Sequence, residues 1–178
     1  LALAEQTQAA DSLQVTALLM GIGVVQGALG NYEEAIRLLQ RALVLQETSL
    51  GPYHPHVSMS LTNLAAMNDA LGRHREAIGP LKRALTIQMR TDGGRDHPDT
   101  AIMLSNLGDA YRACGMPAES REHYVRALEI QERELPPGHD DLASPLFGLG
   151  MLALAEGHLP EAVLRLERAL AVREKHSV

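Results

Sequence analysis

The histidines are the residues of this chain that could bind a metal ion, and three of them recur in a regular pattern. His97 follows His54 by 43 residues and His139 follows His97 by 42, while His56 lies two residues after the first. A structural zinc site needs four ligands around one ion. Each recurring histidine lies in a different linker, separated from the next by a whole pair of predicted helices, so the three cannot converge. We therefore predict no metal site and interpret these histidines as structural residues of loops or helix starts.

Two further groups could do catalytic chemistry, the Glu122-His123 pair and the single cysteine, Cys114. The pair lacks the second histidine, four residues on, that a zinc-protease helix requires, and the chain has no GxxxxGK stretch to cradle a phosphate. Cys114 is better interpreted as a residue packed at a helix end than as a nucleophile. The sequence thus predicts no catalytic residue, no cofactor and no enzymatic activity.

Composition and charge restrict the classes of partner. The net charge is −6 and aromatic residues make up only 3% of the chain. A nucleic-acid binder would need a basic track for phosphates and rings on which bases can stack, so we predict no nucleic-acid partner. No cluster of Lys and Arg suggests a membrane surface, and the most apolar run, Val15 to Val25, is too short to span one. One cysteine without an internal partner fits a reducing, cytoplasmic compartment.

The elements that carry these residues repeat along the chain. Four blocks align, and their glycines, Gly30, Gly72, Gly115 and Gly157, are spaced by 42, 43 and 42 residues. Each block shows apolar residues at helical spacing, and a second helical pattern precedes each glycine. A glycine between two helical patterns predicts a pair of antiparallel helices. The blocks are LGNYEEAIRLLQRALVLQ from Leu29, LGRHREAIGPLKRALTIQ from Leu71, CGMPAESREHYVRALEIQ from Cys114 and EGHLPEAVLRLERALAVR from Glu156.

The Arg-Ala-Leu shared by all four blocks points to a repeated packing contact. Small residues at fixed offsets let two helices approach closely, and a larger side chain fills the space beside them, whereas the arginine stem lies over the outer surface. The predicted contact residues are Ala42, Ala84, Ala127 and Ala169; Ala35, Ala77, Ser120 and Ala162; Gly23, Ala65, Gly108 and Gly150; and the fillers Leu39, Leu81, Tyr124 and Leu166.

This pattern of leucine, small residues and glycine at fixed offsets resembles the tetratricopeptide repeat (TPR), whose usual period is about 34 residues. The longer period and the linkers LGPYHPHV, GGRDHPDT and PPGHDDLA resemble the subclass found in kinesin light chains and nephrocystin-like proteins. The resemblance implies an all-α fold, a TPR-type right-handed superhelical solenoid of four antiparallel helix pairs. Residues 1–178 would form a single array, with 1–10 as the tail of a preceding repeat's second helix and repeats at about 12–53, 54–96, 97–138 and 139–178.

Four positions depart from the pattern. Gly21 and Gly148 stand where the middle repeats have asparagine, so an asparagine-mediated grip would be confined to the middle of the array. Pro80, after Gly79, removes a backbone donor inside a predicted helix and should bend it. Pro145 marks either a kink or a late helix start capped by Ser144. Both ends look cut, which suggests a fragment of a longer protein with apolar ends.

The resemblance places the first helix of each pair along a concave groove. Asparagines in the groove can offer a hydrogen-bond donor and an acceptor to a peptide backbone, and methionines can offer adaptable apolar contact. The alternative is that both residue types only make packing and hydrogen-bond contacts with neighbouring repeats. The groove candidates are Met20, Met59, Thr62, Asn63, Asp69, Ile102, Ser105, Asn106, Asp109, Arg112, Phe147 and Met151, with Ala17, Gly21, Val24, Ala66 and Gly148 on the same lining.

The function that follows from the resemblance is non-catalytic interaction with a protein or peptide. Met20, Thr62, Ser105 and Phe147 occupy the positions where chaperone-binding TPRs place lysines, so the groove lacks a carboxylate clamp and should prefer neutral, apolar or mildly basic ligands. Two alternatives stay open: a structural scaffold with end-to-end self-association, and a regulatory sensor arm of a larger multidomain protein.

Overall fold

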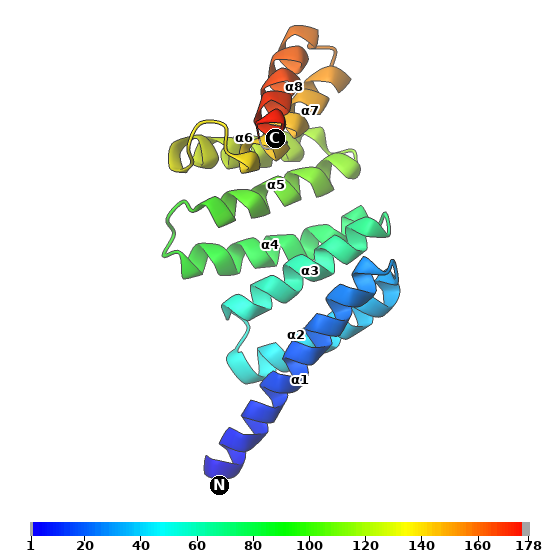
Figure 1. Cartoon of the computed structure of the whole chain (residues 1–178), viewed down its shortest axis with the longest axis vertical. Helices are drawn as coiled ribbons and strands as arrows, with labels where there is room; N and C mark the ends of the chain where they lie inside the picture. The colour runs from blue at the N-terminus through cyan, green and yellow to red at the C-terminus, as the bar shows by residue number, and fades with distance from the viewer. Residues whose placement is uncertain (1, 176–178) are drawn as a thin grey trace. The chain divides into compact units, whose positions relative to one another are not determined.

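The computed structural model describes residues 2–175, and the side chains of residues 13–175. Within this range the chain forms α-helices and one short 3-10 helix, and no strand. Consecutive α-helices pack as pairs, α1 with α2, α3 with α4, α5 with α6 and α7 with α8 (Figure 1). The elements are α1 (Ala2–Ala28), α2 (Tyr32–Leu50), α3 (Pro55–Ala70), α4 (His74–Thr91), α5 (Pro98–Ala113), α6 (Pro117–Glu134), η1 (Asp140–Leu142), α7 (Ala143–Ala155) and α8 (Leu159–Glu174).

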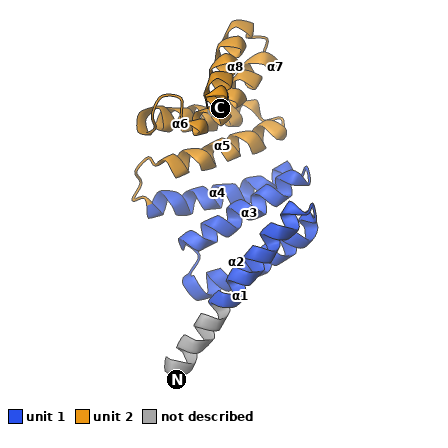
Figure 2. Cartoon of the chain, viewed as in Figure 1, with its two compact units in different colours: residues 1–91 blue, residues 92–178 orange. Residues whose placement is uncertain are grey.

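The chain divides into two compact units, residues 1–91 and residues 92–178 (Figure 2). Unit 1 holds two helix pairs, joined where α2 packs against α3, and unit 2 holds two more, joined where α6 packs against α7. The all-α fold of consecutive helix pairs is therefore confirmed. The repeat boundaries, the single array across both units and its superhelical hand stay predictions. The side chains of residues 1–10, assigned to a preceding repeat, lie outside the described part of the chain.

The helices begin and end where local chemistry favours it. Pro117 and Pro160 lie in the first turns of α6 and α8, as predicted, because a first-turn residue needs no backbone donor. Gly72 and Gly115 follow α3 and α5 with φ of 73° and 70°, a left-handed conformation in which only glycine is unstrained. These turns reverse the chain between the two helices of a pair.

The predicted small residues are buried in every pair, and their contact with the filler side chain is confirmed for α1/α2, α5/α6 and α7/α8. The alanines of the four Arg-Ala-Leu motifs are buried, as are the small residues seven positions before them. On the partner helices, a Cβ added to Gly23 would lie 3.2 Å from Leu39, and one added to Gly150 would lie 2.8 Å from Leu166. Small residues therefore let the paired helices approach until the larger side chain fills the remaining space.

The two prolines have different settings. Pro80 lies inside α4, which continues through it from His74 to Thr91. Pro145 lies in the first turn of α7, which begins at Ala143, so a late start is the correct alternative and a kink is not. Ser144 lies within that helix instead of capping it, because the chain enters α7 through the 3-10 turn η1.

Candidate functional site

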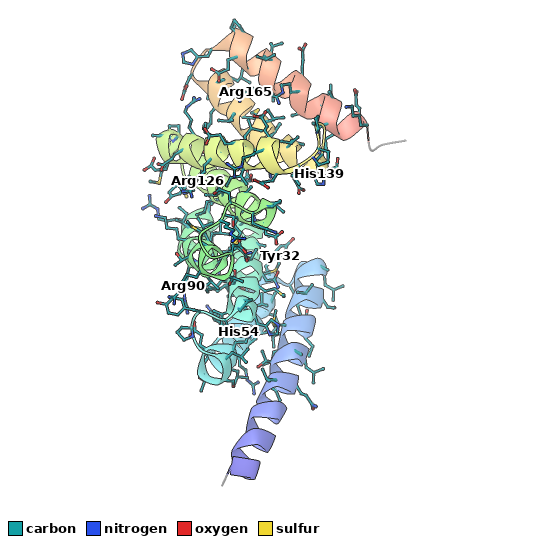
Figure 3. All side chains as sticks on the ribbon, turned by 90° about the vertical axis from the view of Figure 1, so that its left-hand side faces the viewer. Tyr32, His54, Arg90, Arg126, His139 and Arg165 are labelled. Atoms are coloured by element: carbon teal, nitrogen blue, oxygen red, sulfur yellow. The ribbon has the colours of Figure 1, made fainter. Side chains whose placement is uncertain are left out.

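The recurring histidines act as helix caps. Nδ1 of His54 accepts a hydrogen bond from the backbone N–H of His56 at 3.2 Å, and Nδ1 of His97 accepts from Asp99 at the same distance. His139 accepts from Asp141 at 3.3 Å at the start of η1 (Figure 3). Each imidazole thus satisfies one of the free N–H groups of a helix start. The interpretation as helix-start residues is confirmed, and the described residues contain no cluster of three metal-ligating side chains.

Unit 1 carries five of the predicted groove residues. Met59 is exposed and Asn63 is half-buried, both on α3, where Thr62 donates its hydroxyl to the carbonyl of Ser58. Asp69 lies 2.6 Å from Nδ1 of His74. The sulfur of Met20 accepts a hydrogen bond from Nε2 of Gln46 in its own unit. Thr62, Asp69 and Met20 thus already have partners within unit 1. Of the five predicted residues, Met59 and Asn63 are therefore the best placed to contact a ligand.

In unit 2, three predicted residues of α5 line one cavity. Ile102, Ser105 and Asn106 lie on the wall of a hollow of about 140 Å³. The other walls come from α6, η1, α7 and α8, and they add side chains that were not predicted for the groove: Gln131, Asp140, Asp141, Ser144 and Arg173. Seven of the eight lining residues are therefore polar or charged, including two carboxylates and one guanidinium.

A larger hollow of about 560 Å³ lies beside the first and shares Ser144 and Arg173 with it. Two more predicted residues, Asp109 and Phe147, line this hollow, and apart from Ser144 and Arg173 its remaining lining is apolar. The apolar side chains are Ala143, Leu166, Ala169 and Leu170. Five of the predicted groove residues of unit 2 thus gather in two adjoining hollows, one polar and one apolar. Met151 is half-buried on α7 and lines neither of the hollows described here.

Asp109 and Arg112 are tied together by a tyrosine. The hydroxyl of Tyr124 donates to Oδ1 of Asp109 at 2.6 Å and accepts from Nε of Arg112 at 3.4 Å. Burial, followed by the hydrogen bond to Asp109, raises the pKa of the Tyr124 phenol above its ordinary value, because both oppose a negative charge on its oxygen. The phenol therefore stays neutral and holds the two charged groups in place.

The same tyrosine explains a departure from the repeat pattern. A Cβ added to Gly148 would meet three ring atoms of Tyr124 at 2.6 Å or less, and one added to Gly108 would meet the ring at 2.6 Å. The equivalent filler in the other repeats is leucine, which has no such reach. Asparagine is therefore absent at position 148 because the ring occupies its space.

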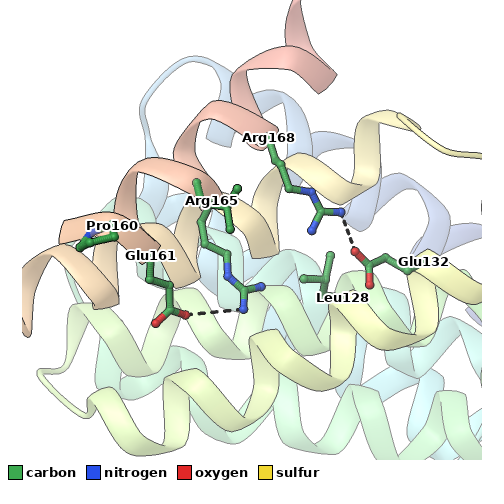
Figure 4. Close-up of a pocket in the computed structure, with 7 residues that line it drawn as sticks. Leu128, Glu132, Pro160, Glu161, Arg165 and Arg168 are labelled. Atoms are coloured by element: carbon green, nitrogen blue, oxygen red, sulfur yellow. Dashed lines mark hydrogen bonds and ion pairs between the residues drawn. The ribbon is translucent and has the colours of Figure 1, made fainter. Parts of the chain in front are cut away.

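Two arginines of the Arg-Ala-Leu motifs, Arg83 and Arg168, have acidic partners that were not predicted. On α8, Arg168 binds Oε1 of Glu132 on α6 at 2.6 Å, and Arg165 lies 3.5 Å from Glu161 of its own helix (Figure 4). In unit 1, Arg83 lies 2.5 Å from Glu47 on α2. Arg83 and Arg168 thus each bridge two successive second helices of their unit, at a spacing of 36 residues that would have been visible in the sequence.

A family comparison now assigns this fold. A model described as the tetratricopeptide repeat matches residues 13–90, 81–131 and 99–175. The chain belongs to the tetratricopeptide repeat (TPR) family. This result confirms the predicted resemblance. The TPR helix pairs supply the architecture, whereas any function depends on the residues that line particular sites.

Solved TPR structures are similar to this chain. One, from Podosopora anserina and described as a kinesin light chain with nearly identical TPR-like repeats, is 28% identical with a TM-score of 0.74, over 91% of this chain and 76% of that chain. BtubC (BKLC) from P. vanneervenii is 22% identical with a TM-score of 0.80, over 90% and 63%. MamA is 21% identical with a TM-score of 0.66, over 90% and 79%. At these lower identities the last two support the fold alone. A comparison with curated proteins gave no match.

None of the TPR helices in the described part of the chain has the length and hydrophobicity that a membrane span requires. Proteins of the TPR family commonly bind other proteins.

Proposed function

We propose that this TPR chain is a non-catalytic interaction module that binds a peptide or a helix of a partner protein. The observation that carries the proposal is the pair of adjoining hollows in unit 2, which brings Ile102, Ser105, Asn106, Asp109 and Phe147 to one surface. A polar hollow beside an apolar one offers both hydrogen bonds and hydrophobic contact, the combination that ligand sites use. Asn63 on unit 1 provides a second amide at the same repeat position as Asn106.

A selection from a phage-displayed library of random peptides, each of about 12 residues, tests the proposal. We expect peptides that bind the intact chain and are lost, by about tenfold or more in affinity, when Asn63 and Asn106 are both replaced by alanine. Far-UV circular dichroism checks that the double variant keeps its helices. Peptides that bind the double variant with unchanged affinity would contradict the groove model.

A second function, end-to-end self-association, is favoured by apolar side chains on the first and last helices. Ile22 on α1 is 49% exposed, whereas Leu64 at the equivalent position of α3 is 7% exposed because α2 covers it. Leu170 on α8 is 57% exposed, whereas its equivalent Leu128 on α6 is 5% exposed against α7. The two ends thus expose complementary halves of an interface that recurs inside each unit.

Light scattering over a range of protein concentrations distinguishes this scaffold role from peptide binding. Self-association predicts a mass that rises with concentration and returns to that of the monomer when Ile22 and Leu170 are both replaced by glutamate. A mass that stays monomeric at all concentrations would exclude the scaffold and leave the peptide module.

A further inference from the structure

A buried glutamine of unit 1 has a complete set of partners. Gln46 lies on α2, and its Oε1 accepts a hydrogen bond from the hydroxyl of Ser60 at 2.7 Å. Its Nε2 donates to the sulfur of Met20 at 3.0 Å. The side chain is satisfied within unit 1, as a buried amide must be.

The same three positions in unit 2 no longer complete this network. Two repeats span 85 residues, because 42 and 43 sum to 85, and adding 85 to positions 46, 60 and 20 gives Gln131, Pro145 and Ser105. Pro145 has no side-chain donor to replace the Ser60 hydroxyl, and Ser105 is much shorter than methionine. The glutamine is kept, whereas both of its partners have changed.

The consequence is a cavity with two unpartnered polar atoms. Ser105 is 3% exposed and Gln131 is 1% exposed, yet neither Oγ of Ser105 nor Oε1 of Gln131 has a hydrogen-bond partner in the described part of the chain. Both residues line the hollow of about 140 Å³, in which Ser105 stands at the position of the longer Met20. Buried polar groups are nearly always paired, so two such atoms on one cavity point to a group that enters it.

We infer that this cavity is a subsite for the primary ammonium group of a lysine side chain on the partner peptide. The replaced residues define what is missing: a slender aliphatic stem in the place of Met20, and a donor in the place of the Ser60 hydroxyl. Lysine supplies both, with three N–H donors at the end of a flexible stem. A turn of the Gln131 carboxamide about its soft terminal torsion carries Oε1 to the entering donor.

The charges of the lining favour a cation over an anion. Asp140 and Asp141 contribute two carboxylates and Arg173 one guanidinium, which leaves one net negative charge on the wall. Oε1 of Gln131 accepts directly from an ammonium group, whereas a carboxylate would need the Nε2 of a turned carboxamide and would meet the net negative charge of the wall. The adjoining apolar hollow, which shares Ser144 and Arg173, then receives an apolar residue close to the lysine in the peptide. This inference rests on the proposed peptide-binding function for its ligand, although the subsite can be tested alone.

The test uses three small probes of similar size on the whole chain: n-butylammonium, butyramide and butyrate. Amide chemical shifts in ¹H–¹⁵N spectra report where each probe binds. We expect n-butylammonium to shift the signals of Ser105, Asn106 and Gln131 and to bind about tenfold more tightly than butyrate, the ratio that one charge-assisted hydrogen bond supplies. Equal binding of butyramide would overturn the preference for a charge, and shifts elsewhere on the chain would overturn the subsite.

Variants separate the subsite from general effects on stability. Replacing Ser105 by Met together with Pro145 by Ser restores the unit 1 network, so this variant should fold well and lose the ammonium shifts. Thr86→Ala is the control, since Thr86 is an exposed residue of α4 outside the hollow and its hydroxyl already bonds to the carbonyl of Lys82 on its own helix. Binding that persists in the restored variant, or that disappears in the control, would contradict the assignment.

The library selection distinguishes failure of the subsite from failure of the proposed function. Peptides that need Asn63 and Asn106 but contain no lysine would overturn the subsite and leave the peptide module intact. No selected peptide, with ammonium binding at Ser105 and Gln131, would overturn the module and support the subsite.

Discussion

Replacement of Gly148 by alanine gives a sharp test of how one ring shapes unit 2. The added Cβ would lie at 2.6 Å or less from three ring atoms of Tyr124, where carbon atoms normally stay about 3.5 to 4.0 Å apart. The ring cannot retreat easily, because Gly108 packs against it and its hydroxyl is bonded to Asp109. Overpacking of this kind lowers the free energy of unfolding by about 1–3 kcal/mol. Because the ring and the added Cβ must move apart by about 1 Å, we expect a cost near the upper limit of this range.

The helix propensity of alanine offsets part of this cost. Alanine is favoured over glycine by about 1 kcal/mol inside a helix, so the net loss in the free energy of unfolding should be about 2 kcal/mol. With Tyr124 replaced by leucine, the filler of the other repeats, the clash disappears and Gly148→Ala should become neutral or stabilising by up to about 1 kcal/mol. The coupling between the two positions should therefore reach about 2–3 kcal/mol, well above the additivity error of about 0.5 kcal/mol.

Urea denaturation followed by far-UV circular dichroism measures these values for the four members of the cycle. Gly21→Ala is the matched control, since Gly21 stands at the same repeat position in unit 1 and an added Cβ there meets nothing within 4 Å. It should be neutral or stabilising by up to about 1 kcal/mol. If Gly148→Ala still costs about 2 kcal/mol in the chain that also carries Tyr124→Leu, the reasoning that the ring excludes a side chain is refuted.

Three further predictions concern packing, capping and pH. Ala84→Leu should lower the free energy of unfolding by about 1–3 kcal/mol in urea, since Ala84 is fully buried between paired helices, and unchanged stability would contradict the close-approach model. His97→Ala should cost about 0.5–2 kcal/mol through loss of the cap on α5, whereas the exposed His56→Ala should cost less; equal effects would argue against capping. The raised pKa of the Tyr124 phenol means that its contribution to stability is complete below about pH 10 and is lost as the pH rises further. Urea midpoints are measured at about pH 9 and about pH 11, on either side of the ordinary phenol pKa. The difference between the two midpoints should be smaller in Tyr124→Phe than in the parent chain, and an equal difference would exclude this phenol as the cause.

Much of the fold could be predicted because it depends on local and periodic features. Each of these features acts within one helix pair: the four glycines form the turns, the prolines occupy first turns, and the small residues of Arg-Ala-Leu allow close packing. The structure places all of them as predicted. The histidine caps also follow from position alone, since each histidine directly precedes a helix start. The prediction that Ser144 caps its helix, by contrast, was wrong. A short 3-10 turn, which the periodicity of the sequence did not reveal, leads the chain into α7.

The candidate site could be predicted only in part. Ile102, Ser105, Asn106, Asp109 and Phe147 were expected on one surface through the family register, and they line two adjoining hollows. Residues that come from other elements were missed. Gln131, Asp140 and Arg173 reach the polar hollow from α6, η1 and α8, and nothing in a single-helix pattern brings three such segments together.

The sequence by itself determined that paired helices form and where they touch, because a small residue at a fixed offset acts through contacts with its own partner helix. Only the tertiary structure decided which side chains are left without partners. The equivalent positions of Gln46 and Gln131 carry the same residue, and their difference arises from Ser60, Pro145, Met20 and Ser105 on other helices. Hydrogen bonding depends on distances of a few tenths of an ångström between separate segments, and such distances exist only once the helices have packed.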